Sequence, residues 1–483
     1  MRQLTALDAQ FLAMESPQTC GHVSMMMVLD PRERPGGKLE LEHVQSVLAE
    51  RLPLLPPFRW RLKSVPFNLD HPYWIDDPDF DLEYHVRELA LPQPATDEKL
   101  SEQIARIASR PLDRSRPLWE LYLIHGLPDG QSALLTKIHH AAVDGMSGAE
   151  ILSVLLDLGP EGRDAPPPQA DTTDPEPSEW EMFGRGLFAT PRYLGRALRA
   201  VPKVLPNLED SPLLAQIPGA TTLGRATERA VRAARRTPAR VLERSTITPP
   251  KTSFNAHVSP HRRFAFGRLS LDDAKAVKKA QGTTLNDVVM SVCAGALRRW
   301  LIDHDELPDG PLVAQIPVSV RTDAQRGTFG NRVGIMSPPL YTDEADPLRR
   351  LALTHEAMDA AKALHKAVPA SLLQDSSEFV PPAVFARATR VTLSLAATRK
   401  PIWNLVISNV PGPQIPLYFD GAEVKALFPV SVVTDGMGLN ITVFSYCGHL
   451  DFGIVADREL MPDLWNLIGY LRESLDEHTA ALV

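Results

Sequence analysis

The chain has 483 residues, of which 44% are hydrophobic and 23% are charged, and its formal net charge is −8. This is the profile of a folded globular protein that is too long for one ordinary core, and it predicts two or three domains. No apolar run approaches the ~20 residues of a membrane-spanning helix, and the N-terminal segment lacks the apolar core of a signal peptide. Three scattered cysteines, Cys20, Cys293 and Cys447, exclude a disulfide framework or a structural zinc site and indicate a reducing cytoplasm.

The charge is distributed unevenly along the chain. Residues 185–244 contain twelve Arg or Lys residues and four acidic residues, which gives this segment +8 and leaves −16 for the remainder. Before it, residues 161–180 hold five prolines and six acids with almost no large apolar side chain. Such a composition cannot bury enough surface to fold, and it predicts an exposed linker. Further prolines within the basic segment predict short helices there instead of one long helix.

The apolar periodicity on either side of this region predicts two α/β halves, residues 1–160 and 251–483, joined by a crossover at 161–250. In the first half a Pro-Asp-Gly turn at 128–130 predicts a β-hairpin. The elements expected there are a helix around Leu4–Leu12, a strand at His22–Leu29, a helix at Leu39–Leu52, hairpin strands at Leu118–Ile124 and Ala133–Ile138, and a helix at Ser147–Leu158.

The second half alternates in the same way and ends in an amphipathic helix. The elements expected there are strands at Arg263–Leu269, Leu312–Val320, Trp403–Ser408, Leu439–Tyr446 and Leu450–Val455, and helices at Asp272–Lys279, Asn286–Trp300 and Leu464–Leu475.

The sharpest motif is His139-His140-Ala141-Ala142-Val143-Asp144-Gly145, which stands where the second hairpin strand ends and a loop leads into a helix. The pattern HHxxxDG is expected by chance in only about one or two chains per thousand. A histidine held on a loop after a rigid strand can take a proton from a substrate hydroxyl and return it, because its pKa lies near neutral pH. Asp144 is interpreted as an organiser of the loop, and Gly145 permits backbone angles that other residues resist.

Two other interpretations of the motif are a pair of packed core histidines and a metal pair. A metal site needs further ligands at defined spacing, and no HExxH or second His/carboxylate cluster stands nearby. Residues 145–149 do not complete GxSxG, and the sequence has neither a P-loop nor a dinucleotide-binding GxGxxG. These absences disfavour a serine hydrolase, an ATPase and a nicotinamide dehydrogenase. No serine or cysteine nucleophile is evident either, which favours direct transfer in a ternary complex, with His as base, over a covalent enzyme intermediate.

The segment HHAAVDG resembles the signature of the acyl-CoA-dependent acyltransferase superfamily, which includes chloramphenicol acetyltransferase, carnitine acyltransferases and condensation domains. Flanking motifs narrow the resemblance to the bacterial wax ester synthase/diacylglycerol acyltransferase family. They occur in family order from residue 4 to about 457, and their order is more specific than any one of them. These motifs are LTALDAQFLAMES at 4–16, Gly21-His22-Val23, RPLWE at 116–120, LNDV at 285–288, PVSVR at 317–321 and SNVPGP at 408–413.

The resemblance implies a two-domain, chloramphenicol acetyltransferase/condensation-like α/β sandwich, with the active site in a channel between the halves. It implies that His140 is the general base, which deprotonates a diacylglycerol or fatty alcohol for attack on acyl-CoA. The product would be triacylglycerol or a wax ester. His139 would support His140, Asp144 would hold the loop, and Arg321 is the candidate partner of Asp144. Acyl-CoA is then a co-substrate, and neither a cofactor nor a metal is expected.

Other polar residues are weaker candidates for the site. Ser408 and Asn409 lie at a predicted strand end, where they can donate to a developing oxyanion, but a turn built by Asn-Val-Pro-Gly-Pro explains them equally well. Asn286 and Asp287 lie at the start of a predicted helix, where a capping role is favoured over a catalytic one. Asp451-Phe452-Gly453 resembles a structural motif of the wider superfamily and is assigned no chemistry.

The basic segment 185–244 has two interpretations. It is either a solvated crossover or a surface that contacts a membrane or lipid droplet, with Leu187 and Phe188 against acyl chains and arginines against lipid phosphates. The second interpretation predicts a cytoplasmic protein peripheral to the inner membrane or to lipid droplets. No nucleic-acid partner is expected, and the oligomeric state is open. The rival functions are acyl transfer to another lipid or polyketide alcohol, and an inactive protein that binds lipid or coats droplets.

Overall fold

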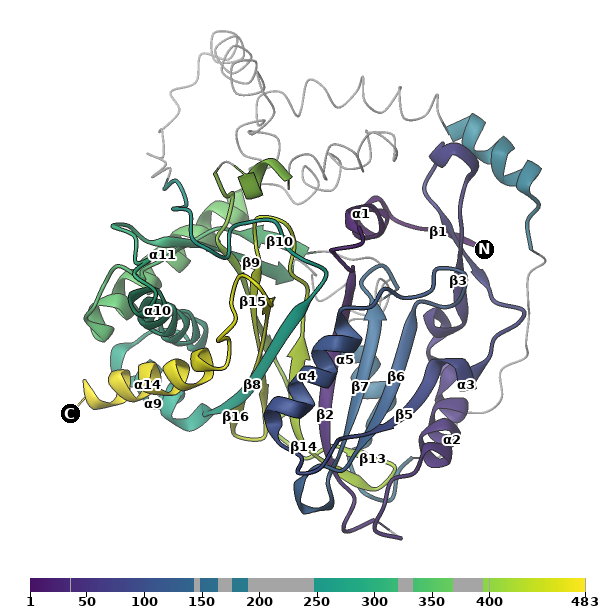
Figure 1. Ribbon diagram of the computed structural model, residues 1–483, viewed down its shortest axis with the longest axis horizontal. Helices are drawn as coiled ribbons and strands as arrows, with labels where there is room; N and C mark the ends of the chain where they lie inside the picture. The colour runs from purple at the N-terminus through teal and green to yellow at the C-terminus, as the bar shows by residue number, and fades with distance from the viewer. Residues whose placement is uncertain are drawn as a thin grey trace.

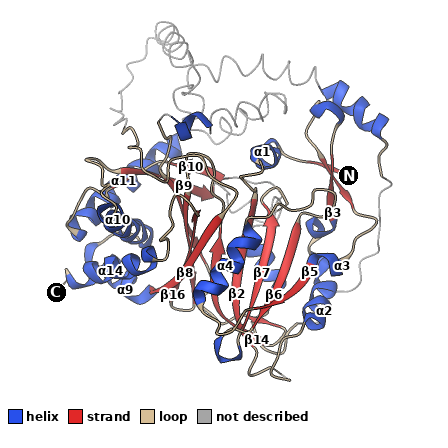
Figure 2. Ribbon diagram, viewed as in Figure 1, coloured by secondary structure: helices blue, strands red, loops and turns tan. Residues whose placement is uncertain are grey.

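The computed structural model describes residues 1–34, 36–142, 148–163, 176–189, 247–319, 333–367, 394–398 and 400–482. Within these residues two large β-sheets stand side by side, with helices on their outer faces and one helix, α4, between them (Figures 1 and 2). A small third sheet lies near the N-terminus, in the order β1-β4-β3. Its strands are β1 (Arg2–Gln3), β4 (Tyr73–Asp76) and β3 (Trp60–Lys63).

The first large sheet contains the hairpin and the strand that the sequence predicts around the histidine motif. β7 pairs antiparallel with β6 on one side and with β2 on the other, and every residue of β7 is buried. The predicted hairpin is therefore confirmed. In spatial order the six strands are β13 (Tyr418–Phe419), β14 (Ala422–Val430), β2 (His22–Asp30), β7 (Ser132–His139), β6 (Trp119–His125) and β5 (Val86–Ala90).

The second large sheet is built from the C-terminal part of the chain. β12 runs parallel to both of its neighbours, β9 and β15, whereas the other pairs are antiparallel. In spatial order its strands are β10 (Val333–Met336), β9 (Leu312–Ser319), β12 (Leu405–Pro411), β15 (Leu439–Tyr446), β16 (His449–Asp457) and β8 (Arg262–Ser270), and β11 (Pro339–Leu340) pairs with β9 beside this path.

Among the predicted strands, β12 differs most from its predicted extent. β12 was expected to end at Ser408, and one interpretation placed Asn409 in a turn. The strand instead continues to Pro411, because its parallel pairing with β15 runs from Val406 opposite Asn440 to Pro411 opposite Ser445. The turn interpretation of Asn409 is therefore wrong. The Pro-Gly-Pro sequence that suggested a turn begins only at the last residue of the strand.

The helices follow from local signals. α10 begins with a capping box in which the side chains of Thr284 and Asp287 each accept the other residue's backbone N–H. α9 ends at Gln281 and is capped by Gly282, whose φ of +66° suits a glycine. No helix in the described ranges is long and apolar enough to cross a membrane. The helices named by the labels in Figure 1 are α1 (Ala6–Met14), α2 (Leu41–Arg51), α3 (Leu82–His85), α4 (Asp97–Ala108), α5 (Gly148–Leu155), α9 (Leu271–Gln281), α10 (Leu285–Asp303), α11 (Pro347–Ala367) and α14 (Asn466–Ala480).

The two large sheets are joined by β14, which lies late in the sequence but pairs with β2 in the first sheet. Asp451, on β16 of the second sheet, accepts the Leu427 N–H of β14 (2.8 Å) and the Arg268 Nε–H (2.8 Å). At Gly453 the sheets approach so closely that a Cβ atom would lie 1.7 Å from the Pro429 carbonyl oxygen. The Asp451-Phe452-Gly453 motif therefore holds the two sheets together. The division into residues 1–160 and 251–483 stays a prediction, and the sheets do not follow it strictly.

Candidate active site

Both histidines of the motif lie where β7 ends, beside the start of β2. His139 is the last residue of β7 and stands opposite His22. The chain then turns, with the His140 N–H donating to the Gly21 carbonyl (2.8 Å) and the Ala142 N–H donating to the His139 carbonyl (2.9 Å). The neighbouring strand therefore holds the backbone of both histidines in place.

A carboxylate lies against His139. Glu15 Oε1 is 3.2 Å from His139 Nε2 and accepts the Gly21 N–H (2.8 Å), while Arg114 Nε donates to Oε2 (3.1 Å). Burial alone would raise the pKa of Glu15, but His139, the Gly21 N–H and Arg114 together lower it to about 2. His139 Nδ1 accepts the Ala141 N–H (3.0 Å), so a neutral His139 carries its proton on Nε2, facing Glu15. This arrangement orients the His139 ring toward Glu15.

His140 has a different environment. Its imidazole stacks on Phe11, with ring centroids 3.9 Å apart and planes 6° from parallel. Its Nδ1 is closed off from solvent and has no hydrogen-bond partner among the described residues. Burial, and after it the charge of His139, lower the pKa of His140 to about 4. A hydrogen bond with the backbone of His140 itself acts in the opposite direction and raises this pKa. His140 is therefore neutral near pH 7 and able to accept a proton.

Gly21 lies where Glu15, at the end of α1, approaches His139, at the end of β7. There is no room for a side chain at this position. A Cβ atom at this position would lie 2.8 Å from His139 Nε2 and 3.2 Å from both Glu15 Cγ and the Phe11 carbonyl oxygen. Any larger residue would push apart the groups that hold the histidines. The Gly21-His22-Val23 motif is thus explained by a close approach beside the site.

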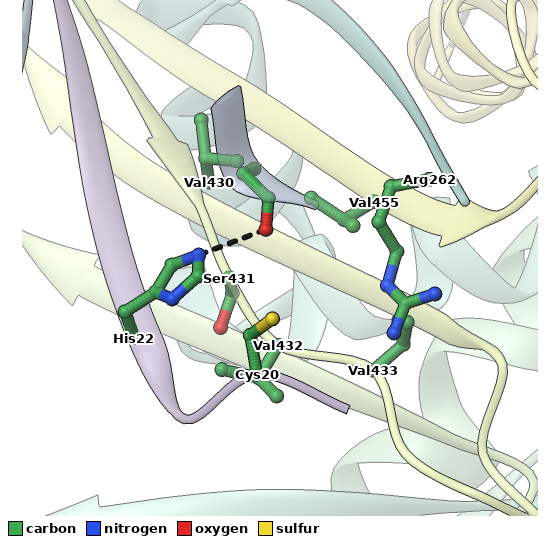
Figure 3. A pocket seen from close by; sticks show the side chains of 9 residues that line it. Cys20, His22, Arg262, Val430, Ser431, Val432, Val433 and Val455 are labelled. Carbon is green, nitrogen blue, oxygen red and sulfur yellow. Dashed lines mark hydrogen bonds between the residues drawn. The ribbon is translucent and has the colours of Figure 1, made fainter. Parts of the chain in front are cut away.

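A small cavity lies between the two sheets beside His22 and is lined by Cys20 and Arg262, among others (Figure 3). His22 Nε2 lies 2.8 Å from the Ala108 carbonyl oxygen, and burial together with the charge of Lys137 lowers the pKa of His22 to about 3. The cavity measures about 10 Å³, which is room for no more than one water molecule. It is therefore not a substrate site, and His22 is a neutral structural residue.

Three residues predicted for the site lie outside the described residues: Asp144, Gly145 and Arg321. The loop role of Asp144 and its pairing with Arg321 stay predictions. In the described part of the chain, no three His, Cys, Asp or Glu side chains are grouped so as to hold a metal ion.

One hydrogen bond joins two of the four weaker candidates. Asn409 Nδ2 donates to Asn286 Oδ1 (3.2 Å), which brings together two residues that the sequence analysis treated separately. Asp287 is fully buried, caps α10, and lies 2.7 Å from His355 Nδ1, so its capping interpretation is confirmed. Ser408 precedes Asn409 on β12 and is half-buried.

Sequence reasoning missed the residues that contact the two histidines directly, Glu15 and Phe11. Both lie in the motif LTALDAQFLAMES, which served only to carry the family resemblance. A helix around Leu4–Leu12, which includes Phe11, was expected from the sequence, and no role was assigned to Glu15. An acidic residue directly after an apolar helix, six residues before Gly21, is the signal that was available.

The fold defines the class of protein. Solved structures with this fold include the first condensation domain of the calcium-dependent antibiotic synthetase, with a TM-score of 0.53 and 15% identity over 100% of this chain and 96% of that one. They also include trichothecene 15-O-acetyltransferase from Fusarium sporotrichioides, with a TM-score of 0.55 and 12% identity over 98% and 94% of the two chains. At such identities the likeness concerns the fold alone, and it confirms the predicted condensation-like α/β class.

The sequence places the chain more narrowly. Residues 4–289 match the wax ester synthase/diacylglycerol acyltransferase catalytic domain, and residues 329–478 match the WS/DGAT C-terminal domain. A putative diacylglycerol O-acyltransferase of Mycobacterium tuberculosis is 36% identical over 478 residues, covering 99% of this chain and 90% of the relative. The O-acyltransferase WSD of Acinetobacter baylyi is 31% identical over 476 residues, covering 98% and 96%.

A solved structure agrees with these sequence matches. The wax ester synthase/diacylglycerol acyltransferase from Marinobacter aquaeolei VT8 superimposes with a TM-score of 0.69 at 30% identity, covering all of both chains. The chain therefore belongs to the wax ester synthase/diacylglycerol acyltransferase family and is an acyltransferase, as the resemblance of its motifs predicted.

Proposed function

We propose that this protein transfers the acyl group of acyl-CoA to the hydroxyl of diacylglycerol, forming triacylglycerol, and that it also esterifies fatty alcohols to wax esters. Its family membership supports this reaction, since its relatives are named for these two activities. The observation that carries the proposal is the environment of His140. The end of β7 holds its backbone in place, its imidazole is neutral near pH 7, and no acidic side chain pairs with it among the described residues.

In the proposed reaction, His140 Nε2 takes the proton of the acceptor hydroxyl. The hydroxyl oxygen forms a bond to the thioester carbonyl carbon, and the carbonyl oxygen becomes an oxyanion. When the carbon–sulfur bond breaks, the imidazolium returns the proton to the CoA thiolate, so the products are an ester and free CoA. Much of the acceleration comes from holding both substrates in place beside His140.

The supporting residues act on the position of His140 or on the oxyanion. His139, held against Glu15, fixes the start of the turn that carries His140. Ser408 and Asn409 are the proposed oxyanion donors, and the contact of Asn409 with Asn286 orients the Asn409 amide. The contact also links the start of α10 to β12. The proposed role of Asn286 is therefore to position Asn409, without contact with the substrate.

The acceptor is tested with purified protein and labelled palmitoyl-CoA, offered hexadecanol or dioleoylglycerol in separate reactions. We expect labelled ester in both, and more triacylglycerol than wax ester. Ester with hexadecanol alone would reassign the protein to wax ester synthesis. If neither acceptor gives ester, other lipid and polyketide alcohols are offered and the release of CoA is measured. Release of CoA with one of them would favour transfer to that class of alcohol. No release with any of them would favour an inactive lipid-binding protein.

Contact with a lipid surface is a second part of the proposal. The helix at 179–189 and the tip of the β3–β4 hairpin form an aromatic patch whose side chains are largely exposed: Phe67 (83%), Trp180 (83%), Phe188 (75%) and Leu187 (57%). Phe183 connects two of them, with its ring 6.2 Å from that of Phe67 and 6.3 Å from that of Trp180. In Figure 1 this helix is drawn in teal at the top of the view, beside the hairpin.

The shape and chemistry of the patch suit a lipid surface. Phe67 lies in the turn of the hairpin, is largely exposed, and has a φ of +58°, which is uncommon for a bulky residue. Aromatic side chains prefer the boundary between lipid headgroups and acyl chains. The basic segment 185–244 begins within this helix, and its arginines complement anionic headgroups.

Replacing Trp180 and Phe188 together by Ser is expected to weaken binding to anionic vesicles about tenfold or more, because two large apolar side chains no longer enter the lipid. Co-sedimentation with phosphatidylglycerol vesicles measures this change. Leu158→Ser is the matched control, since Leu158 is 77% exposed but lies outside the patch. Unchanged binding of the double variant would refute the patch, and unchanged binding after replacement of the arginines of 185–244 would refute the electrostatic part.

A further inference from the structure

α1 is the element that reaches both histidines of the motif. Phe11, in its second turn, stacks on His140, and Glu15, the residue that caps its C-terminal end, lies against His139. Neither residue belongs to HHxxxDG, and they lie more than a hundred positions before it in the sequence. One short helix therefore contacts both imidazole rings.

α1 is anchored at both ends, so the ring of Phe11 has a defined place. At the start, Thr5 and Asp8 form a capping box. At the end, Arg114 Nη2 donates to the Leu12 carbonyl (2.8 Å) and Arg114 also pairs with Glu15. Phe11 itself is half-buried between these anchors.

The stack has two physical consequences for His140. At 3.9 Å and 6° the phenyl ring covers one face of the imidazole in direct contact, so rotation of the imidazole out of this plane would break the contact. When His140 becomes protonated, the face of the phenyl ring attracts the cation. Among the described residues no carboxylate is paired with His140. Phe11 is therefore the described side chain that is placed both to hold the plane of the imidazole and to stabilise its protonated form.

We propose that Phe11 is a positioning residue for His140, which holds the plane of the imidazole so that Nε2 points at the acceptor hydroxyl and which stabilises the imidazolium formed during transfer. The kinetic side of this proposal rests on the proposed function, whereas the stacked geometry does not. Phe11 takes part in no bond change: the proton passes from the hydroxyl to Nε2 and from Nε2 to the CoA thiolate.

The kinetic test compares Phe11→Leu, which keeps an apolar side chain but removes the ring, with Phe11→Tyr and Phe11→Trp, which keep a ring. We expect Phe11→Leu to lower kcat by about 10- to 100-fold, as displacement of a reacting group by about 1 Å does, with little change in KM for acyl-CoA. At least one of the ring-bearing variants is expected to retain kcat within a few-fold of the wild type. Each variant's melting temperature shows whether it is folded.

A spectroscopic signature tests the stack without activity. In protein labelled at histidine Cε1, the His140 Cε1–H resonance is identified by its loss in His140→Ala. In the wild type it is expected to lie upfield of its position in Phe11→Leu, because the stacked ring shields it. The same upfield position is expected in the active ring-bearing variant.

The outcomes separate this proposal from the proposed function. If the wild type esterifies neither acceptor, the proposed function fails while the resonance still tests the stack. The proposal for Phe11 is overturned if folded Phe11→Leu keeps the wild-type kcat, if its His140 resonance does not move, or if neither ring-bearing variant restores kcat although both melt at the wild-type temperature.

Discussion

His140→Ala is expected to lower kcat/KM for ester formation by about 10²- to 10⁴-fold, the usual contribution of a general base. The loss follows because the variant lacks the imidazole that is proposed to take the hydroxyl proton. The fold should survive, since the strand end is held through the His140 backbone N–H to Gly21, which the substitution keeps. Turnover with labelled palmitoyl-CoA and dioleoylglycerol measures the effect, and a wild-type melting temperature confirms that the variant is folded.

The matched variant is His139→Ala, for which we expect a milder loss, because His139 faces Glu15 and not the acceptor. The pH dependence gives a second check. Since burial lowers the pKa of His140 from 6.5 to about 4, its base form persists as pH falls through 6.5 and is lost only as pH falls through about 4. The acid limb of kcat/KM in the wild type should therefore lie well below pH 6.5. A limb at 6.5, or near wild-type turnover of His140→Ala, would contradict the assignment.

Gly453→Ala is expected to be the most destabilising single change at a glycine between the sheets. The added Cβ would lie 1.7 Å from the Pro429 carbonyl oxygen and 2.8 Å from its carbon, and both are backbone atoms of a paired strand that cannot rotate away. To make room, β14 and β16 must move apart, which also disturbs the hydrogen bond from the Leu427 N–H to Asp451. We expect a loss of about 3 kcal/mol or more in the free energy of unfolding, at the upper end for overpacked cores.

Urea unfolding followed by circular dichroism measures this loss. Gly469→Ala, on α14, is the control, because its added Cβ meets no atom within 4 Å and alanine favours a helix interior by about 0.5–1 kcal/mol over glycine. The control should be neutral or slightly stabilising. Equal stability of Gly453→Ala and the wild type would show that the sheets are not pressed together at this point, and would remove the structural explanation of the Asp451-Phe452-Gly453 motif.

The predicted elements around the site were largely correct because their signals are local. The Pro-Asp-Gly turn and the apolar runs beside it identify β6 and β7, and the motif stands at the end of β7 as expected. The helix from Asn286 was expected from its capping residues, and α10 indeed begins at the capping box of Thr284 and Asp287. β12 was predicted too short, because the pairing that extends it to Pro411 comes from β15, outside the local sequence.

The sequence by itself determined the class of chemistry, since two histidines at a strand end carry it and the order of the motifs identifies the family. Only the tertiary structure decided what surrounds those histidines. Glu15 and Phe11 reach them across more than a hundred residues, and β14 enters the first sheet from the far end of the sequence. Local periodicity specifies which face of a strand or helix is buried, but which distant element covers that face depends on how whole sheets pack. The sequence therefore identified the proposed base, His140, whereas the packing of distant elements decided which residues surround it.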